Sequence, residues 1–73
     1  MSDNLDAVAE RTMKYTLEIL EEDPTRWPVA RRGVERILAD LETGAPGHRA
    51  IERLRRFLAE RQADYDEGRD ETR

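Results

Sequence analysis

Apolar residues return every three or four positions along most of this chain, and that period is interrupted at only two places. The three periodic stretches cover residues 3–22, 28–43 and about 47–65. This spacing places apolar side chains on one face of an α-helix. No stretch shows the alternation of apolar and polar residues that is typical of a half-buried strand. The sequence therefore predicts an all-α fold built from three helices.

The two interruptions carry residues that end helices. Asp23 precedes Pro24, and a residue before proline avoids the α region, so the first helix is expected to end there. Pro28 suits the first turn of a second helix. Gly44 is expected to end that helix, and the following connector is short enough to fold the third helix back antiparallel.

These elements predict one domain, residues 1–66, folded as a small three-helix antiparallel (up-down-up) bundle. The expected helices span about 3–22, 28–43 and 47–65. Residues 67–73 contain no apolar side chain, so we expect a disordered, acidic C-terminal tail. A chain of 73 residues without cysteine buries a modest core and has no disulfides to reinforce it.

The first helix has more apolar surface than one neighbour needs. Its apolar arc spans about 200°, against the roughly 100° stripe that covers a single core. We expect this helix to contact two neighbours, one of which could be a second copy of the chain. A row of small residues, Ala9, Thr12 and Thr16, has two interpretations. Its hydroxyls bond to carbonyls four residues earlier while its methyls pack in the core, or the row is the seam of a homodimer.

The single tryptophan, Trp27, also has two interpretations. In an up-down-up bundle the start of the second helix meets the ends of the other two, which places Trp27 near Arg61 and Tyr65. Trp27 could be a lid on that end of the core, with the Arg61 guanidinium over the indole ring. Alternatively, Trp27 could be an anchor for a partner, because tryptophan and arginine are frequent in binding hot spots.

Charge is distributed unevenly along the chain. Charged residues make up 41% of the sequence, and the formal net charge is −4. Residues 26–61 carry a balance of +4 between an acidic start, residues 1–25 at −5, and an acidic end, residues 62–73 at −3. Such segregation favours binding to a charged macromolecule. The candidate protein-binding surface is the acidic face of the first helix: Asp6, Glu10, Glu18, Glu21 and Glu22.

Arginines on the second and third helices provide an alternative, nucleic-acid-binding surface. The pI of about 5.0 and the lack of aromatic residues between the arginines argue against it. Internal ion pairs with the acids of the first helix, or pairs such as Arg49 with Glu52 and Arg56 with Glu60, would also account for these residues. The candidate residues are Arg31, Arg32, Arg36, Arg49, Arg53 and Arg56.

The sequence offers little chemistry. It has one histidine, His48, one serine, Ser2, and no cysteine, so no nucleophile–base set can be assembled and no structural zinc site is expected. We therefore expect no enzymatic activity, catalytic residue, metal, cofactor or small-molecule substrate. No stretch is apolar enough to span a membrane, and the first residues do not resemble a signal peptide, so we expect a cytoplasmic protein with no membrane partner.

Together these observations favour a small non-enzymatic regulator or inhibitor that binds a larger protein and masks one of its surfaces. An acidic protein of this size could mimic nucleic acid, so a nucleic-acid-handling protein is a suitable partner. Two alternatives stay open at this point. One is a nucleic-acid-binding regulator that uses the arginines, and the other is a self-assembling structural protein, such as a homodimer.

Overall fold

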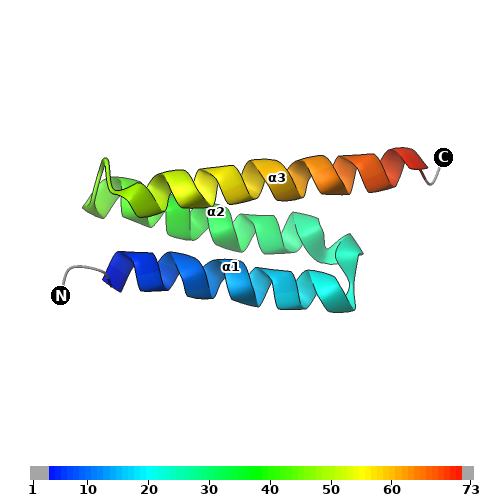
Figure 1. The fold of residues 1–73 in the computed structure, drawn as a ribbon, viewed down its shortest axis with the longest axis horizontal. Helices are drawn as coiled ribbons and strands as arrows, with labels where there is room; N and C mark the ends of the chain where they lie inside the picture. The colour runs from blue at the N-terminus through cyan, green and yellow to red at the C-terminus, as the bar shows by residue number, and fades with distance from the viewer. Residues whose placement is uncertain (1–3, 72–73) are drawn as a thin grey trace.

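A computed structural model describes residues 4–71 of the chain as three long helices and one short turn of 3-10 helix. In chain order these are α1 (Asn4–Glu22), η1 (Pro24–Arg26), α2 (Trp27–Gly44) and α3 (Arg49–Glu71), and the described residues contain no strand. Helix α2 runs antiparallel to both α1 and α3 (Figure 1). The predicted all-α, three-helix, up-down-up bundle is confirmed.

The first corner of the bundle is formed by η1. The backbone N–H of Asp23 donates to the carbonyl of Ile19 (3.0 Å), the last hydrogen bond before the turn. The Asp23 carboxylate then accepts from the backbone N–H (3.1 Å) and the hydroxyl (2.6 Å) of Thr25, and these two bonds lower the pKa of Asp23. Pro28 lies in the first turn of α2, as expected.

The second corner differs in detail from the sequence prediction. Gly47 has a φ of 87°, a left-handed conformation that favours glycine. His48 then caps α3, because its Nδ1 atom accepts a hydrogen bond from the backbone N–H of Ala50 (3.0 Å). Helix α3 therefore begins at Arg49, two residues later than expected, while α2 includes Gly44.

Helix α3 is longer than the apolar period indicated. We expected it to end at about residue 65, but it continues to Glu71, and its last turns project past the corner between α1 and α2 (Figure 1). Residues 66–68 of this extension are exposed, so it continues the backbone hydrogen bonds of the packed part of α3 without core contacts of its own. The amide of Gln62 adds a hydrogen bond to Asp66 one turn later (3.1 Å). Residues 67–71 of the expected tail are thus helical, and residues 72–73 lie outside the described residues.

The core lies along the axis of the bundle and receives side chains from all three helices. Ala9 of α1, Val34 of α2 and Leu54 of α3 are each 1% exposed or less. Burial of a valine or leucine side chain contributes about 1.5–3 kcal/mol, so a few such residues account for most of the apolar stabilisation. The buried cluster is completed by Leu41, Ala50, Ile51 and Phe57.

Candidate functional site

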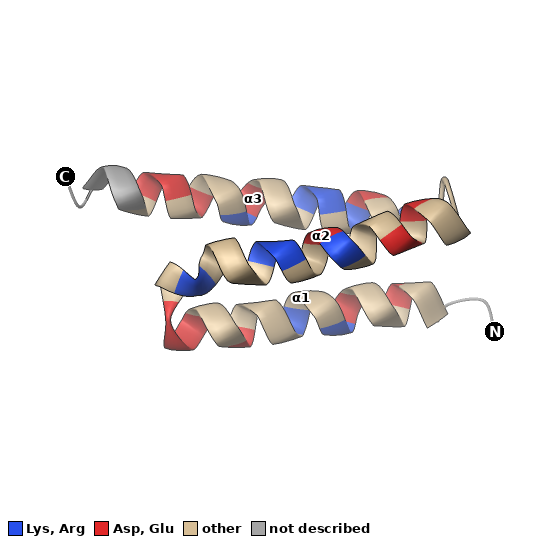
Figure 2. Cartoon of the chain, turned by 180° about the vertical axis from the view of Figure 1, so that it is seen from behind, with Lys and Arg blue, Asp and Glu red and all other residues tan. Residues whose placement is uncertain are grey.

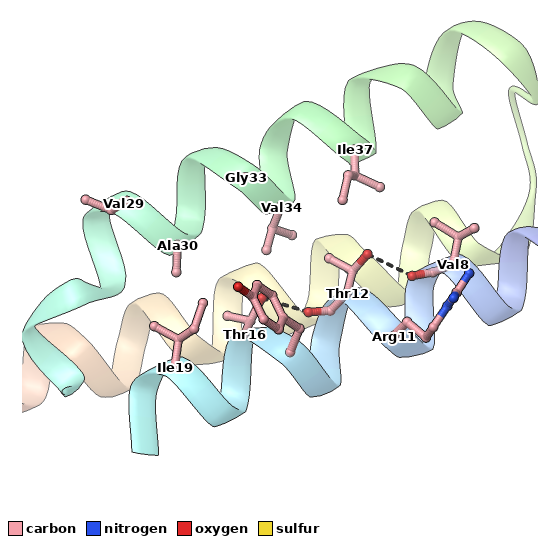
Figure 3. Close-up of a pocket in the computed structure, with 11 residues that line it drawn as sticks. Val8, Arg11, Thr12, Thr16, Ile19, Val29, Ala30, Gly33, Val34 and Ile37 are labelled. Carbon is pink, nitrogen blue, oxygen red and sulfur yellow. Dashed lines mark hydrogen bonds between the residues drawn. The ribbon is translucent and has the colours of Figure 1, made fainter. Parts of the chain in front are cut away.

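An open apolar groove lies between α1 and α2. It has a volume of about 510 Å³, and in the close-up view α3 lies behind it (Figure 3). Arg11 is the one charged side chain among the described residues that line the groove. Two of the lining residues are apolar and far more exposed than packing requires: Val29 at 69% and Tyr15 at 66%. The lining residues are Val8, Arg11, Thr12, Tyr15, Thr16, Ile19, Val29, Ala30, Gly33, Val34 and Ile37.

Two threonines in this groove contribute little polarity. The Thr12 hydroxyl donates to the Val8 carbonyl and the Thr16 hydroxyl donates to the Thr12 carbonyl, each at 2.7 Å (Figure 3). These are the i−4 bonds predicted from the sequence. Ala9, the third member of the small-residue row, is fully buried in the core and does not line the groove. The row is therefore divided, and its first member packs inside the bundle.

At Gly33, the α2 wall of the groove has no side chain. A Cβ atom added at Gly33 would meet no atom within 4 Å, so the protein itself does not use the space that the missing side chain leaves. Glycine inside a helix costs about 1 kcal/mol relative to alanine. Its position opposite Thr16 (Figure 3) allows another element to approach the α2 backbone closely.

The acidic face of α1 is split between internal pairs and uncompensated charges. The Asp6 carboxylate accepts a hydrogen bond from Nε of Arg49 (2.7 Å) and lies 3.6 Å from Nη1 of Arg53. Glu10 also pairs with Arg53, at 3.4 Å. Asp6 and Glu10 thus form, with Arg49 and Arg53, a group of ion pairs between α1 and α3 that we call the strap. They are not part of a free surface. The other three predicted residues form no ion pair with any described residue: Glu18, Glu21 and Glu22.

The strap determines the ionisation of its most buried acid. The Asp6 side chain is 14% exposed, and the hydrogen bond from Arg49 lowers the pKa of its carboxyl against the opposing effect of desolvation. The positive charges of Arg49 and Arg53 act in the same direction as that hydrogen bond. Asp6 is therefore held as a carboxylate, and its charge is directed at α3.

The six candidate arginines do not form one basic surface. Arg49 and Arg53 are in the strap, and Arg31 pairs with Glu35 at 3.6 Å. Arg49 thus pairs with Asp6 across the bundle. The two pairs suggested from the sequence, Arg49 with Glu52 and Arg56 with Glu60, are not among the ion pairs found in the described part of the chain. The remaining three are separated, because Arg56 lines a hollow between α1 and α3 while the other two lie on α2: Arg32 and Arg36.

Basic and acidic residues both occur on each of the three helices (Figure 2). A further pair, Arg55 with Glu42, joins α3 to α2. Electrostatic binding to a nucleic acid requires several cations on one face. The structure instead uses half of the candidate arginines in ion pairs of its own.

Trp27 is buried in the protein's own fold. Its side chain is 1% exposed, and its indole N–H donates to Oε1 of Gln62 at 2.8 Å. Nη1 of Arg31 donates to the same oxygen at 3.0 Å. This burial supports the lid interpretation over the exposed anchor. Gln62 was not among the predicted residues of the lid. Its position next to Arg61, which was predicted there, is the sequence feature that could have indicated its role.

The other two members of the predicted lid have different surroundings. Nη2 of Arg61 pairs with Asp64, three residues later on α3, at 2.9 Å. Tyr65 is half-buried on the same helix. The hydrogen-bond partner of the Trp27 indole is therefore Gln62, and the Arg61 guanidinium pairs within its own helix.

Neither metal-site chemistry nor a known relative adds to this description. Among the side chains that the structure describes, those of residues 4–68, no three His, Cys, Asp or Glu are grouped so that they could hold a metal ion. None of the helices in residues 4–71 combines the length and apolar content needed to cross a bilayer. No family model matches the sequence, and no match was found among curated proteins or solved structures.

Proposed function

We propose that this protein is a non-enzymatic protein-interaction module, and that the groove between α1 and α2 receives an α-helical surface of another polypeptide chain. The observation that carries this proposal is the groove itself, about 510 Å³ with one charged lining residue. Exposed apolar side chains gathered in one place mark a contact surface. Val29 and Tyr15 are largely exposed in the isolated chain, so neither side chain is used to build its core.

The shape of the groove favours a helix as its occupant. Two antiparallel helices form its walls, and the α1 wall presents Val8, Thr12, Tyr15 and Ile19, spaced at three or four residues. A helix laid along such a surface packs its ridges between those of the walls. In the close-up view α3 lies behind the groove, and it contacts both α1 and α2 (Figure 3). The open space at Gly33 permits a close approach.

Within this proposal, the role favoured by the sequence is a regulator or inhibitor that acts by occupying a surface of a larger protein. The groove supplies the apolar contact. Glu18, Glu21 and Glu22 supply negative charge near the end of the groove formed by Ile19. Asp6 and Glu10 are not part of this surface, because α3 already engages them. A cytoplasmic location stays a prediction from the sequence.

Site-specific photo-crosslinking in cells that naturally encode the protein tests this proposal. A photoreactive amino acid replaces Val29, which lines the groove, and in a second variant it replaces Leu17. Leu17 is the matched control because it is apolar, 44% exposed and on α1, but does not line the groove. We expect a discrete crosslinked polypeptide from position 29 and none from position 17.

Two outcomes would contradict the proposal. One is the absence of any crosslinked polypeptide from position 29 although the variant is folded and expressed. The other is equal crosslinking from both positions, which would indicate random encounters rather than docking in the groove.

A further inference from the structure

We propose that the polypeptide that covers the groove is a second copy of this chain, with the two α1 helices antiparallel and joined by reciprocal Arg11–Glu18 ion pairs. This inference rests on the proposed function in its general form, a groove that binds another polypeptide chain, and names the occupant of that groove. If it holds, the groove is not the surface that contacts a larger protein. It is carried by the seven-residue spacing of Arg11 and Glu18, by the lack of an ion-pair partner for either among the described residues, and by the open space at Gly33.

Arg11 and Glu18 lie on the same side of α1. They are seven residues apart, which is about two helical turns and about 10.5 Å along the axis. Arg11 lines the groove, and Glu18 precedes Ile19, which also lines it. Both side chains are exposed, and neither forms an ion pair with any described residue. Each is therefore an exposed charge on α1 that has no ion-pair partner among the described residues.

One symmetry operation satisfies both charges. A two-fold axis that crosses α1 midway between Arg11 and Glu18, beside Tyr15, sets a second α1 antiparallel to the first. Each Arg11 then faces Glu18 of the other copy, because an isologous interface places residue i opposite j and j opposite i. The two ion pairs flank the contact of the exposed Tyr15 rings. A single helix that carries a positive and a negative charge at this spacing is complementary to itself.

The α2 side of the groove fits the same axis. Across the groove, Ile37 lies opposite Thr12, and Gly33 lies opposite Thr16 (Figure 3). The axis midway along α1 therefore crosses α2 between Gly33 and Ile37. The branched side chain of Ile37 from one copy then faces Gly33 of the other, where an added Cβ atom would have no neighbour within 4 Å. The vacant space receives the largest aliphatic side chain of that wall.

The other two-fold arrangement does not pair Arg11 with Glu18. An axis parallel to the helices would lay α1 of one copy on α2 of the other, with every residue opposite its own level. Arg11 and Glu18 would then each face α2 of the other copy, and neither would meet the other. The antiparallel arrangement gives both charges a partner of opposite sign, and it is therefore the one that we propose.

Charge-swap variants measured by sedimentation equilibrium test this inference on the full chain. We expect the wild type to dimerise with rising concentration. Arg11→Glu and Glu18→Arg should each raise the dissociation constant about tenfold or more, since each replaces two attractions by two repulsions. An equimolar mixture of the two variants should associate about as tightly as the wild type, because each supplies the charge that the other lacks. Arg56→Glu, on the α1–α3 hollow, is the matched control and should leave the dissociation constant unchanged.

Several results would overturn the inference. A wild type that stays monomeric at every concentration excludes the second copy, and so does a dimer that responds equally to Arg11→Glu and Arg56→Glu. Failure of the mixture to recover association excludes the reciprocal pairs. A monomer whose position 29 crosslinks to a different protein overturns this inference and leaves the proposed function intact. The absence of any crosslink from position 29 removes the proposed function itself.

Discussion

The two sides of α1 are built from the same helix but are completed in different ways. Toward α3, the seam holds a hollow of about 450 Å³ in which five of the seven lining residues are charged, and Asp6, Glu10, Arg49 and Arg53 pair across it. Toward α2, the outer groove is larger, about 510 Å³, and one of its eleven lining residues is charged. The chain thus provides counter-charges on the side of α1 that faces α3. On the side that faces α2, no element of the described chain covers the outer groove.

This difference separates what the fold needs from what it leaves exposed. Ion pairs at a surface contribute little to stability, so the α1–α3 strap mainly fixes how these helices are aligned. Exposed apolar residues at Tyr15 and Val29 do not stabilise the isolated bundle, and an apolar patch is a liability in water unless something covers it. The open side of α1 is therefore where we place the contact with another chain.

The largest expected effect separates the buried lid from the open groove. Trp27→Ala should lower the free energy of unfolding by about 3–5 kcal/mol, because a large side chain that is 1% exposed is removed. Tyr15→Ala, in the groove, should change it by less than about 0.5 kcal/mol. Urea unfolding followed by circular dichroism measures both. Equal effects of the two substitutions would show that the groove is as important to the fold as the core.

A smaller effect is expected from the acceptor beneath the lid. Gln62→Ala should cost about 1–3 kcal/mol, since the Trp27 indole N–H loses its partner inside the fold. Gln62→Glu keeps an oxygen at that position and should cost less than the alanine substitution. The same urea titration compares them, and an alanine variant as stable as the wild type would show that this hydrogen bond does not hold the lid.

Gly33→Ala should affect the two sides of the comparison in opposite directions. It should stabilise the isolated chain by up to about 1 kcal/mol, because alanine favours the helix and no atom lies within 4 Å of the added Cβ. It should also weaken association through the groove, where that space is used. Gly68→Ala, at an equally open position in α3, is the control for stability without a contact. Unfolding curves and sedimentation report the two quantities, and tighter association of Gly33→Ala would contradict the close approach.

The smallest expected effect comes from the charged side of α1. The pKa values of Asp6 and Asp23 are lowered from 3.8 in the folded protein. Their contribution to stability is present above pH 3.8 and is lost as the pH falls through the lower, folded-state values. Asp6→Asn should flatten this acid-side loss in part, with the Asp23 contribution remaining. Urea midpoints taken at decreasing pH measure it, and an unchanged pH dependence would show that the strap does not act through Asp6.

Local patterns predicted most of the fold, since they depend on neighbours in the sequence. The apolar period placed the three helices, and the i−4 bonds of Thr12 and Thr16 followed from their position in α1. The end of α3 was placed too early, because an apolar pattern marks where a helix packs rather than where its backbone bonds stop. The cap by His48 was missed because histidine is an uncommon capping residue.

Partners across the bundle could not be read in the same way. Asp6 and Arg49 are 43 residues apart, and their pairing depends on how α1 and α3 are rotated about their axes. The same is true of Trp27 and Gln62. The wide apolar arc of α1 predicted contact with two neighbours, and the structure provides both within the chain, α2 and α3. Locating the groove required α2, because half of its wall is formed by residues such as Gly33 and Ile37.

Alkylation of single cysteines tests most directly whether another chain covers the groove. The sequence contains no cysteine, so Val29→Cys and Leu17→Cys each report one position. Their reaction rates with N-ethylmaleimide are compared in cells and in dilute purified protein. For each variant, the rate in cells is divided by the rate in dilute solution. We predict that this ratio is lower for Val29→Cys than for Leu17→Cys. Equal rate ratios at the two positions would contradict the central claim.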